Sequence, residues 1–260
     1  MILWLNGALL PAAEARIDPA DRGFSLGDGV FETICVREGK PLHLPRHLAR
    51  LQAGLDLLAI PRPEVPFVEA MKAVLAANSL SEAALRLTVS RGVAARGVLP
   101  QGPVFPTVLM TASPLPATLP AARLVIAQAT RRNEFSPLSR VKSLNYLDNI
   151  LARQEAASRD ADDALLLNTQ GFVVEATAAN LFLCLEGALI TPPLADGALP
   201  GIARALLIEH EGAVERSVLP QDLARAEGAF LSNSLGLRAV ASVEGRRLPA
   251  PPTRIAGLRP

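Results

Sequence analysis

The sequence predicts a mixed α/β protein of two domains, and three observations support this. Half of the 260 residues are hydrophobic and a fifth are charged, which is typical of a folded protein with a sizeable core. Helix-like and strand-like patterns are mixed along the chain without strict alternation. Residues 113–120 contain three prolines and predict a stiff connector. We therefore expect a smaller N-terminal α/β domain at 1–113, a linker at 114–120 and a larger domain with mixed strands at 121–260.

In the first domain, Asn6-Gly7 predicts a hairpin between two short strands within residues 2–10. Three glycines within residues 23–29 indicate a backbone that takes tight turns or is approached closely by another group. The other elements expected in this domain are a strand at 30–37, helices at 45–59 and 64–78, and strands at 85–91 and 104–111.

The second domain is expected to begin with a strand and to contain one long helix. Its elements are a strand at 123–130, a helix at 147–158, short strands within 164–191, a turn at 192–200, a helix at 201–210, and strands at 228–234 and 238–243. The end of the chain, 249–260, is expected to be a loose tail.

Charge and composition point to a small-molecule partner. The net charge is +1 and no basic block stands apart, so neither nucleic acid nor a membrane surface is expected. Cys35 and Cys184 lie in apolar runs without metal-ligand spacing, which predicts buried thiols and no metal site. The N-terminus has no basic region and no apolar run is long enough to span a bilayer, so we expect a cytoplasmic protein.

Lys142 is the strongest candidate for chemistry that needs a primary amine. The chain has only three lysines, and Lys40 is expected in an exposed turn and Lys72 on a solvent-facing helix surface. Lys142 stands between Val141 and Leu144, where partial desolvation would lower the pKa of the amine and make it a nucleophile toward carbonyls. The alternative is a lysine near a helix start that extends to water.

Glu175 is an acid in a largely apolar stretch, where an unpaired carboxylate would be costly. It could form a salt bridge with an arginine, or it could face a cationic ring nitrogen. Gly201 opens a predicted helix and could expose backbone N–H groups to a phosphate, although Pro-Gly is also an ordinary helix start. Ser232-Asn233-Ser234 offers further donors. Arg46 and Arg50 share a helical face, which could bind an anion or simply be solvated.

The order of these motifs along the chain carries more information than any one of them. The motifs are Arg-Gly-Phe-x-x-Gly-Asp-Gly-Val-Phe-Glu-Thr from Arg22, Arg-His-x-x-Arg-Leu from Arg46, Lys-Ser-Leu-Asn from Lys142, Val-Glu-Ala-x-x-Ala-Asn-Leu-Phe from Val174, Leu-Pro-Gly-Ile-x-Arg from Leu199, and Ser-Asn-Ser from Ser232. In this order they resemble the class IV, or fold-type IV, pyridoxal phosphate enzymes over about residues 2–245. A chance lysine would not bring the other motifs with it.

The resemblance implies a fold-type IV enzyme with pyridoxal 5′-phosphate (PLP) as cofactor and a homodimer as assembly. It implies that Lys142 forms the Schiff base and then moves protons, and that Glu175 pairs with the pyridine nitrogen. The phosphate would be held by Arg50, by the backbone N–H groups of Ile202 and Ala203, and by Ser234. Gly201 and Asn233 are also expected to bind the cofactor. Relatives carry Thr where this chain has Ala203, so the phosphate would depend more on backbone donors.

Within this family the sequence looks most like the 4-amino-4-deoxychorismate lyases. D-amino acid aminotransferases of the best-known type carry Arg-x-His, whereas this chain has Arg96-Gly97-Val98. We expect Phe31 and Arg96 to matter for the substrate. A transaminase acting on D-amino acids, branched-chain amino acids or (R)-amines stays open as an alternative. A non-catalytic protein that keeps the fold would be expected to lose Lys142, Glu175 or Arg50, and all three are present.

Overall fold

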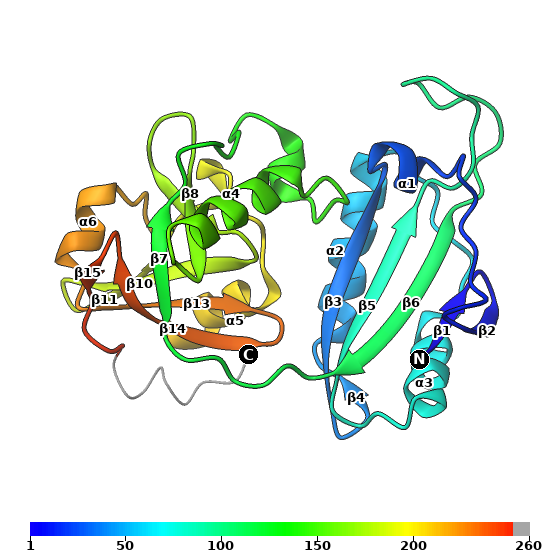
Figure 1. The fold of residues 1–260 in the computed structure, drawn as a ribbon, viewed down its shortest axis with the longest axis horizontal. Helices are drawn as coiled ribbons and strands as arrows, with labels where there is room; N and C mark the ends of the chain where they lie inside the picture. Colours follow the sequence, from blue (N-terminus) through cyan, green and yellow to red (C-terminus); the bar gives the residue numbers. More distant parts are fainter. Residues whose placement is uncertain (252–260) are drawn as a thin grey trace. The chain divides into compact units, whose positions relative to one another are not determined.

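The computed structural model describes residues 1–251, and the chain forms two compact units (Figure 1). The first unit comprises Met1–Pro116 together with Val141–Asn145. The second comprises Ala117–Arg140 and the chain from Tyr146 onward. The sequence assigned all of 121–260 to the larger domain, whereas the structure groups the lysine-bearing segment Val141–Asn145 with the first unit.

The first unit is built on an antiparallel sheet in the order β2-β1-β6-β5-β3-β4. Its elements in chain order are β1 (Ile2–Leu5), β2 (Ala8–Pro11), α1 (Arg22–Leu26), β3 (Gly29–Arg37), β4 (Lys40–Pro41), α2 (Leu44–Leu57), α3 (Phe67–Ala77), β5 (Ala83–Ser90) and β6 (Thr107–Pro114).

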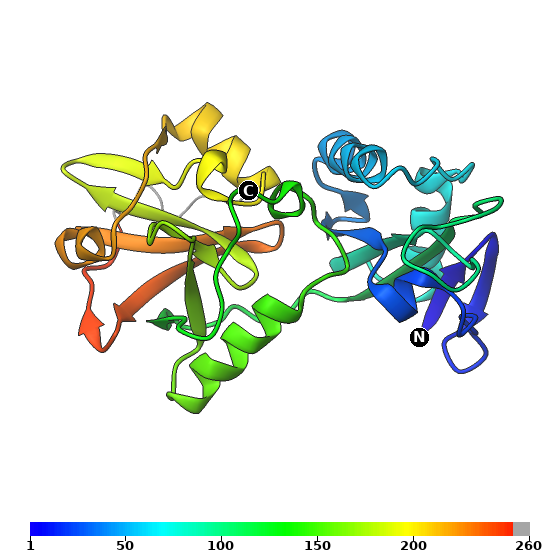
Figure 2. The same cartoon turned by 90° about the horizontal axis from the view of Figure 1, so that it is seen from above.

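The two long helices of this unit, α2 and α3, pack on the same face of the sheet (Figure 2). Alternate residues of β3 and β5, such as Ile34 and Leu87, point into this layer and are fully buried with Leu55 of α2 and Met71 of α3. The intervening residues of the strands point to the opposite face, which neither α2 nor α3 covers, although the short helix α1 lies against its Ser90 end. This open face carries the side chain of Phe31.

The second unit contains a larger mixed sheet in the order β12-β11-β10-β13-β14-β7-β8-β9, with β15 paired to β14. Its elements in chain order are β7 (Ala122–Ile126), η1 (Pro137–Arg140), α4 (Leu147–Ser158), β8 (Asp163–Leu167), β9 (Val173–Ala176), β10 (Ala179–Leu185), β11 (Ala188–Thr191), η2 (Leu194–Asp196), α5 (Ile202–Glu211), β12 (Val214–Glu215), α6 (Pro220–Arg225), β13 (Gly228–Asn233), β14 (Gly236–Val243) and β15 (Arg246–Arg247).

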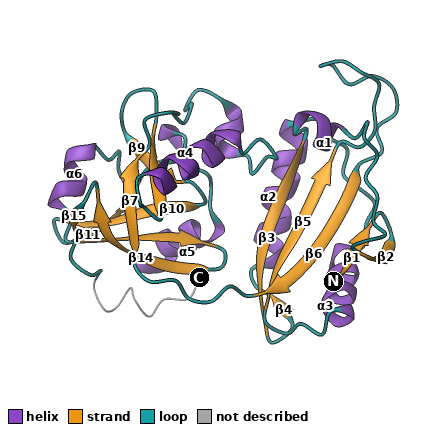
Figure 3. Cartoon of the chain, in the orientation of Figure 1, coloured by secondary structure: helices purple, strands orange, loops and turns teal. Residues whose placement is uncertain are grey.

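Because β9 pairs with β10 as well as with β8, the strands from β10 through β13, β14, β7, β8 and β9 close into a ring. Apolar side chains such as Leu124, Leu165 and Leu231 fill its interior. The helices lie outside the strands (Figure 3). Helix α5 packs on β10 and β13 through Leu207, which contacts the stacked rings of Phe182 and Phe230.

Most expected elements are present, and the differences have local causes. The helix expected at 147–158 has those bounds, whereas the strand expected at 104–111 begins at Thr107, after Pro103 and Pro106, which cannot donate to a ladder. Helices α1 and α6 were not predicted, although Asp21 caps α1 and Pro220 begins α6. The expected tail lies outside the described residues from 252 onward. Within residues 1–251 no helix is long and apolar enough to cross a membrane.

Candidate active site

Lys142 is held against the start of β3 by backbone hydrogen bonds. The N–H of Phe31 donates to the carbonyl of Lys142, and the N–H of Leu144 donates to the carbonyl of Gly29, each at 2.9 Å. This approach requires Gly29, because a Cβ at that position would lie 2.5 Å from the carbonyl oxygen of Val89 and 2.8 Å from a methyl of Leu144. The glycine-rich stretch therefore lets the lysine segment dock on β3. This agrees with the expectation that another group approaches this stretch closely.

The Lys142 amine lies over an aromatic ring on the open face of the first unit. Its Nζ is 4.3 Å from the ring centre of Phe31, which is itself buried. Lys142 is half-buried, whereas Lys40 and Lys72 are exposed. This contact favours a partly desolvated amine over a lysine that simply extends to water.

Arg50 is oriented by a buried carboxylate that sequence reasoning missed. Glu32 of β3 has no exposed surface and accepts hydrogen bonds from Nε of Arg50 at 2.8 Å and from Nη2 at 2.6 Å. Nδ1 of His47 lies 2.6 Å from the same carboxylate. Burial acts to raise the pKa of Glu32, but the hydrogen bonds and charges of Arg50 and His47 outweigh it, and the pKa lies below its ordinary value. Arg46 is exposed, whereas Arg50 is half-buried against Glu32.

Arg96 is exposed. The backbone carbonyls that follow it accept hydrogen bonds from a residue of the N-terminal signature. Arg22 donates to the carbonyls of Gly97 and Val98 at 2.7 and 2.8 Å. Asp28 accepts from Nε of Arg22 and from Nε of Arg91. Although burial opposes ionisation, these arginines keep the pKa of Asp28 below its usual range. The signature thus fixes the backbone next to Arg96.

In the second unit, Glu175 of β9 is buried and contacts several protein groups. Nη2 of Arg132 lies 3.3 Å from one of its oxygens. The other oxygen accepts from the Asn180 amide at 3.1 Å and from the Leu199 N–H at 3.0 Å. Glu175 therefore forms a salt bridge with an arginine, which was one of its two interpretations from the sequence. These contacts fix the carboxylate in place and are compatible with a further cationic partner.

The N-terminus of α5 lies beside this carboxylate network. Gly201 is the N-cap and no side chain caps the helix, so the first N–H groups, those of Ile202 and Ala203, have no intrahelical acceptor. A Cβ at Gly201 would lie 2.0 Å from Oδ1 of Asn180, so only glycine allows this approach. The helix start thus presents backbone donors that are suited to an anion, and its role in binding phosphate stays a prediction.

Ser232 adds a buried hydroxyl to the same region. It pairs with Asn180 across β13 and β10, so both side chains are on the face that α5 covers. Its Oγ is buried and has no hydrogen-bond partner among residues 1–251. Ser234 follows in the next turn and is half-buried. Asn233 instead closes that turn, because its Oδ1 accepts from the Leu235 N–H at 2.9 Å.

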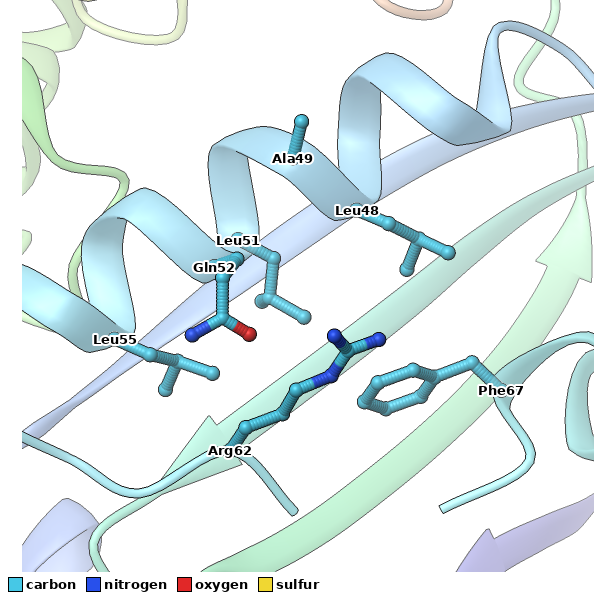
Figure 4. A pocket seen from close by; sticks show the side chains of 7 residues that line it. All are labelled: Leu48, Ala49, Leu51, Gln52, Leu55, Arg62 and Phe67. Carbon is cyan, nitrogen blue, oxygen red and sulfur yellow. The ribbon is translucent and has the colours of Figure 1, made fainter. Parts of the chain in front are cut away.

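A separate hollow of about 270 Å³ lies beside α2 (Figure 4). It is lined by Leu48, Leu51, Leu55, Phe67 and the exposed Arg62, together with Ala49 and Gln52. None of the predicted site residues lines it.

Sequence reasoning also missed Arg132 and Arg86. Arg132 contacts Glu175, and the Cζ of Arg86 lies 3.8 Å from the ring centre of Phe31. For Glu32 there was a signal, since a lone acid occupies an inward position of an apolar strand. The two arginines gave none, because the chain carries many arginines and their neighbours are distant in sequence.

Comparison with known proteins agrees with this architecture. The family model described as amino-transferase class IV matches residues 29–243. A Methanocaldococcus jannaschii protein assigned provisionally as a branched-chain-amino-acid aminotransferase is 34% identical, with 95% of this chain and 89% of the relative covered. The aminodeoxychorismate lyase of Vibrio harveyi is 32% identical, with 95% and 92% covered. The crystal structure of 4-amino-4-deoxychorismate lyase from Pseudomonas aeruginosa superposes with a TM-score of 0.86 at 34% identity, covering 98% of this chain and 96% of that one.

The chain therefore belongs to the class IV aminotransferase family. It has the fold-type IV architecture and is an enzyme of this family. Enzymes of this class depend on PLP, which is accordingly its cofactor. The second unit fits a phosphate-bearing group, because the N–H groups at the uncapped start of α5 and the Ser232 hydroxyl can each donate to the oxygens of an anion and have no acceptor among residues 1–251.

Proposed function

We propose that the enzyme is a 4-amino-4-deoxychorismate lyase, which converts its substrate to 4-aminobenzoate and pyruvate. The observation that carries this choice is the pair Arg96 and Val98, where D-amino acid aminotransferases of the best-known type carry Arg-x-His. Val98 is exposed, and its carbonyl accepts a hydrogen bond from Arg22. Because valine stands at this position, the loop offers no imidazole next to Arg96. Ser-Asn-Ser-Leu-Gly-Leu from Ser232 and Ala-Ala-Asn-Leu-Phe from Ala178 also look like the lyases.

In this proposal Nζ of Lys142 would hold the cofactor until the amine of the substrate takes its place. The freed Lys142 amine would then remove the proton from the amine-bearing carbon of the substrate. Bound PLP supplies an electron sink for the charge that remains on that carbon. Loss of the enolpyruvyl group as pyruvate leaves an aromatic ring, and aromatisation drives the reaction forward.

The other predicted residues bind and orient the cofactor. Glu175 pairs with the pyridine nitrogen. The phosphate is held by Arg50, the first turn of α5 with Gly201, Ile202 and Ala203, and the turn with Asn233 and Ser234. Phe31 and Arg96 contact the substrate. A homodimer and residence in the cytoplasm stay predictions of the sequence, and gel filtration with light scattering tests the first of them.

A class IV transaminase remains the alternative, acting on D-amino acids, branched-chain amino acids or (R)-amines. Both reactions share the removal of the same proton, so the residues that bind the cofactor do not separate them. A relative named for branched-chain activity is as similar to this chain as the solved lyase is.

The decisive test compares two reactions of the purified holoenzyme. We expect release of 4-aminobenzoate and pyruvate from aminodeoxychorismate, measured by fluorescence and by a coupled assay. We also expect the visible band of the cofactor to stay unchanged when D-alanine is added without a keto acid. If D-alanine bleaches the band and no 4-aminobenzoate forms, the transaminase alternative replaces the lyase.

Replacing Glu175 by glutamine tests its role at the cofactor. The amide keeps the size of the side chain but cannot hold a proton on a ring nitrogen, so we expect cofactor to remain bound while turnover falls by about 100-fold or more. Absorption spectra and turnover measure the two effects. Glu186→Gln is the control, because Glu186 is exposed and pairs with Arg225. Unchanged turnover in Glu175→Gln would refute the pyridinium role.

A further inference from the structure

Arg86 lies on the open face of the first unit. It contacts the same aromatic ring, that of Phe31, as Lys142 does. In the register of β3 and β5, Arg86 is opposite Thr33 and Phe31 is opposite Thr88. These side chains share the face that α2 and α3 leave uncovered, because Leu85 and Leu87 on either side of Arg86 are buried in the helix-covered core. Arg86 is exposed, whereas Phe31 is buried.

Phe31 brings two cations together. The guanidinium carbon of Arg86 is 3.8 Å and Nζ of Lys142 is 4.3 Å from the centre of its ring. Each cation is attracted to the electron-rich ring, and two like charges at one ring raise the positive potential around it. A negatively charged ligand would lower that potential. The two hydroxyls of Thr33 and Thr88 add polar groups to the same face.

The stacked geometry also suits an arginine that binds a carboxylate. A guanidinium whose flat face lies on an aromatic ring keeps its N–H donors in its own plane, which is the geometry of paired hydrogen bonds with a carboxylate. The ring therefore restricts the orientation of Arg86 before any ligand arrives, which lowers the entropic cost of binding.

We propose that Arg86 is a specificity-determining residue that binds a carboxylate of the substrate while the amine of the substrate takes the place of Lys142 at the cofactor. This inference rests on the proposed lyase function. The group that Arg86 binds is the ring carboxylate of the substrate, which lies across the six-membered ring from the amine. The site thus takes amines that carry a carboxylate on the far side of a compact ring.

The test measures equilibrium binding to the holoenzyme, so it does not depend on turnover. Chorismate is the probe, because it keeps both carboxylates of the proposed substrate and has a hydroxyl in place of the amine that would displace Lys142. Pyruvate is the second probe, as a small carboxylate that both candidate reactions release or consume. Isothermal titration calorimetry compares wild type, Arg86→Gln and Arg86→Lys with Arg62→Gln, a change at an exposed arginine of the same unit.

We expect Arg86→Gln to weaken chorismate binding by about 10- to 100-fold, the scale of a lost charge-assisted pair of hydrogen bonds. Arg86→Lys should restore part of the affinity, and Arg62→Gln should bind as wild type does. In turnover, Arg86→Gln should raise the KM for aminodeoxychorismate more than it lowers kcat, and the visible band of the cofactor should stay unchanged. An arginine that merely supports Phe31 would alter the band and kcat rather than the KM.

The outcomes separate this proposal from the lyase assignment. If wild type does not release 4-aminobenzoate but Arg86→Gln still weakens pyruvate binding, the lyase assignment fails and the role of Arg86 stands. If Arg86→Gln binds both probes as tightly as wild type, or if wild type binds neither, the role of Arg86 is overturned, whatever the turnover assay shows.

Discussion

Replacing Lys142 by alanine should remove the visible absorption of the bound cofactor and lower turnover by at least about 1,000-fold, because the nucleophile and the proton-transfer group are the same atom. The structure supports this expectation through the place of the side chain. The backbone of Lys142 is bound to Phe31 of β3, and its amine lies over the Phe31 ring. No neighbouring lysine can take over, since Lys40 and Lys72 are exposed elsewhere on the first unit.

Lys72→Ala is the matched control, because Lys72 lies on the exposed side of α3. It should keep the visible band and full turnover. Absorption spectra and initial rates of both variants, with circular dichroism to verify folding, decide the matter. A folded Lys142→Ala protein that is still yellow and fully active would exclude Lys142 as the cofactor-binding lysine.

Local patterns along the chain predicted much of the fold. Asn6-Gly7 forms the expected hairpin between β1 and β2, and the long helix of the second unit has the expected bounds. These features depend on neighbours within one turn or one strand, so their signal is contained in a short window. The family and its cofactor followed from the order of several motifs, and the match to the class IV aminotransferases confirms both.

Contacts between distant segments were not predictable in the same way. Val141–Asn145 belongs to the first unit because it docks on β3, far away in the sequence, and no composition shift marks that return. The partners of the candidate residues have the same character. Arg132 reaches Glu175, and Glu32 reaches Arg50, only because strand register and helix packing bring them together. A sequence window contains the residues but not these distances.

Glu32→Ala should be the most destabilising single change among the residues discussed here, with a loss of about 3–5 kcal/mol in the free energy of unfolding. The carboxylate is fully buried between β3 and α2 and accepts two hydrogen bonds from Arg50. Removing it leaves a largely buried guanidinium and the buried His47 without their acceptor. Since the same contacts orient Arg50, the affinity for PLP should fall as well, if Arg50 binds the phosphate as proposed.

The pH dependence identifies the cause of this loss. In the folded protein the pKa of Glu32 lies below its ordinary value of 4.5. The ionised carboxylate therefore stabilises the fold at neutral pH, and this contribution is lost as the pH falls through the pKa of the folded state. The difference in unfolding free energy between wild type and Glu32→Ala should therefore be constant above about pH 5 and shrink below pH 4.5. Urea unfolding at several pH values measures it. Glu82→Ala is the control, since Glu82 pairs with Arg37 on the exposed surface, where solvent screens the charges, and should change stability far less. A difference that stays constant to low pH would show that Glu32 acts through packing and not through its charge.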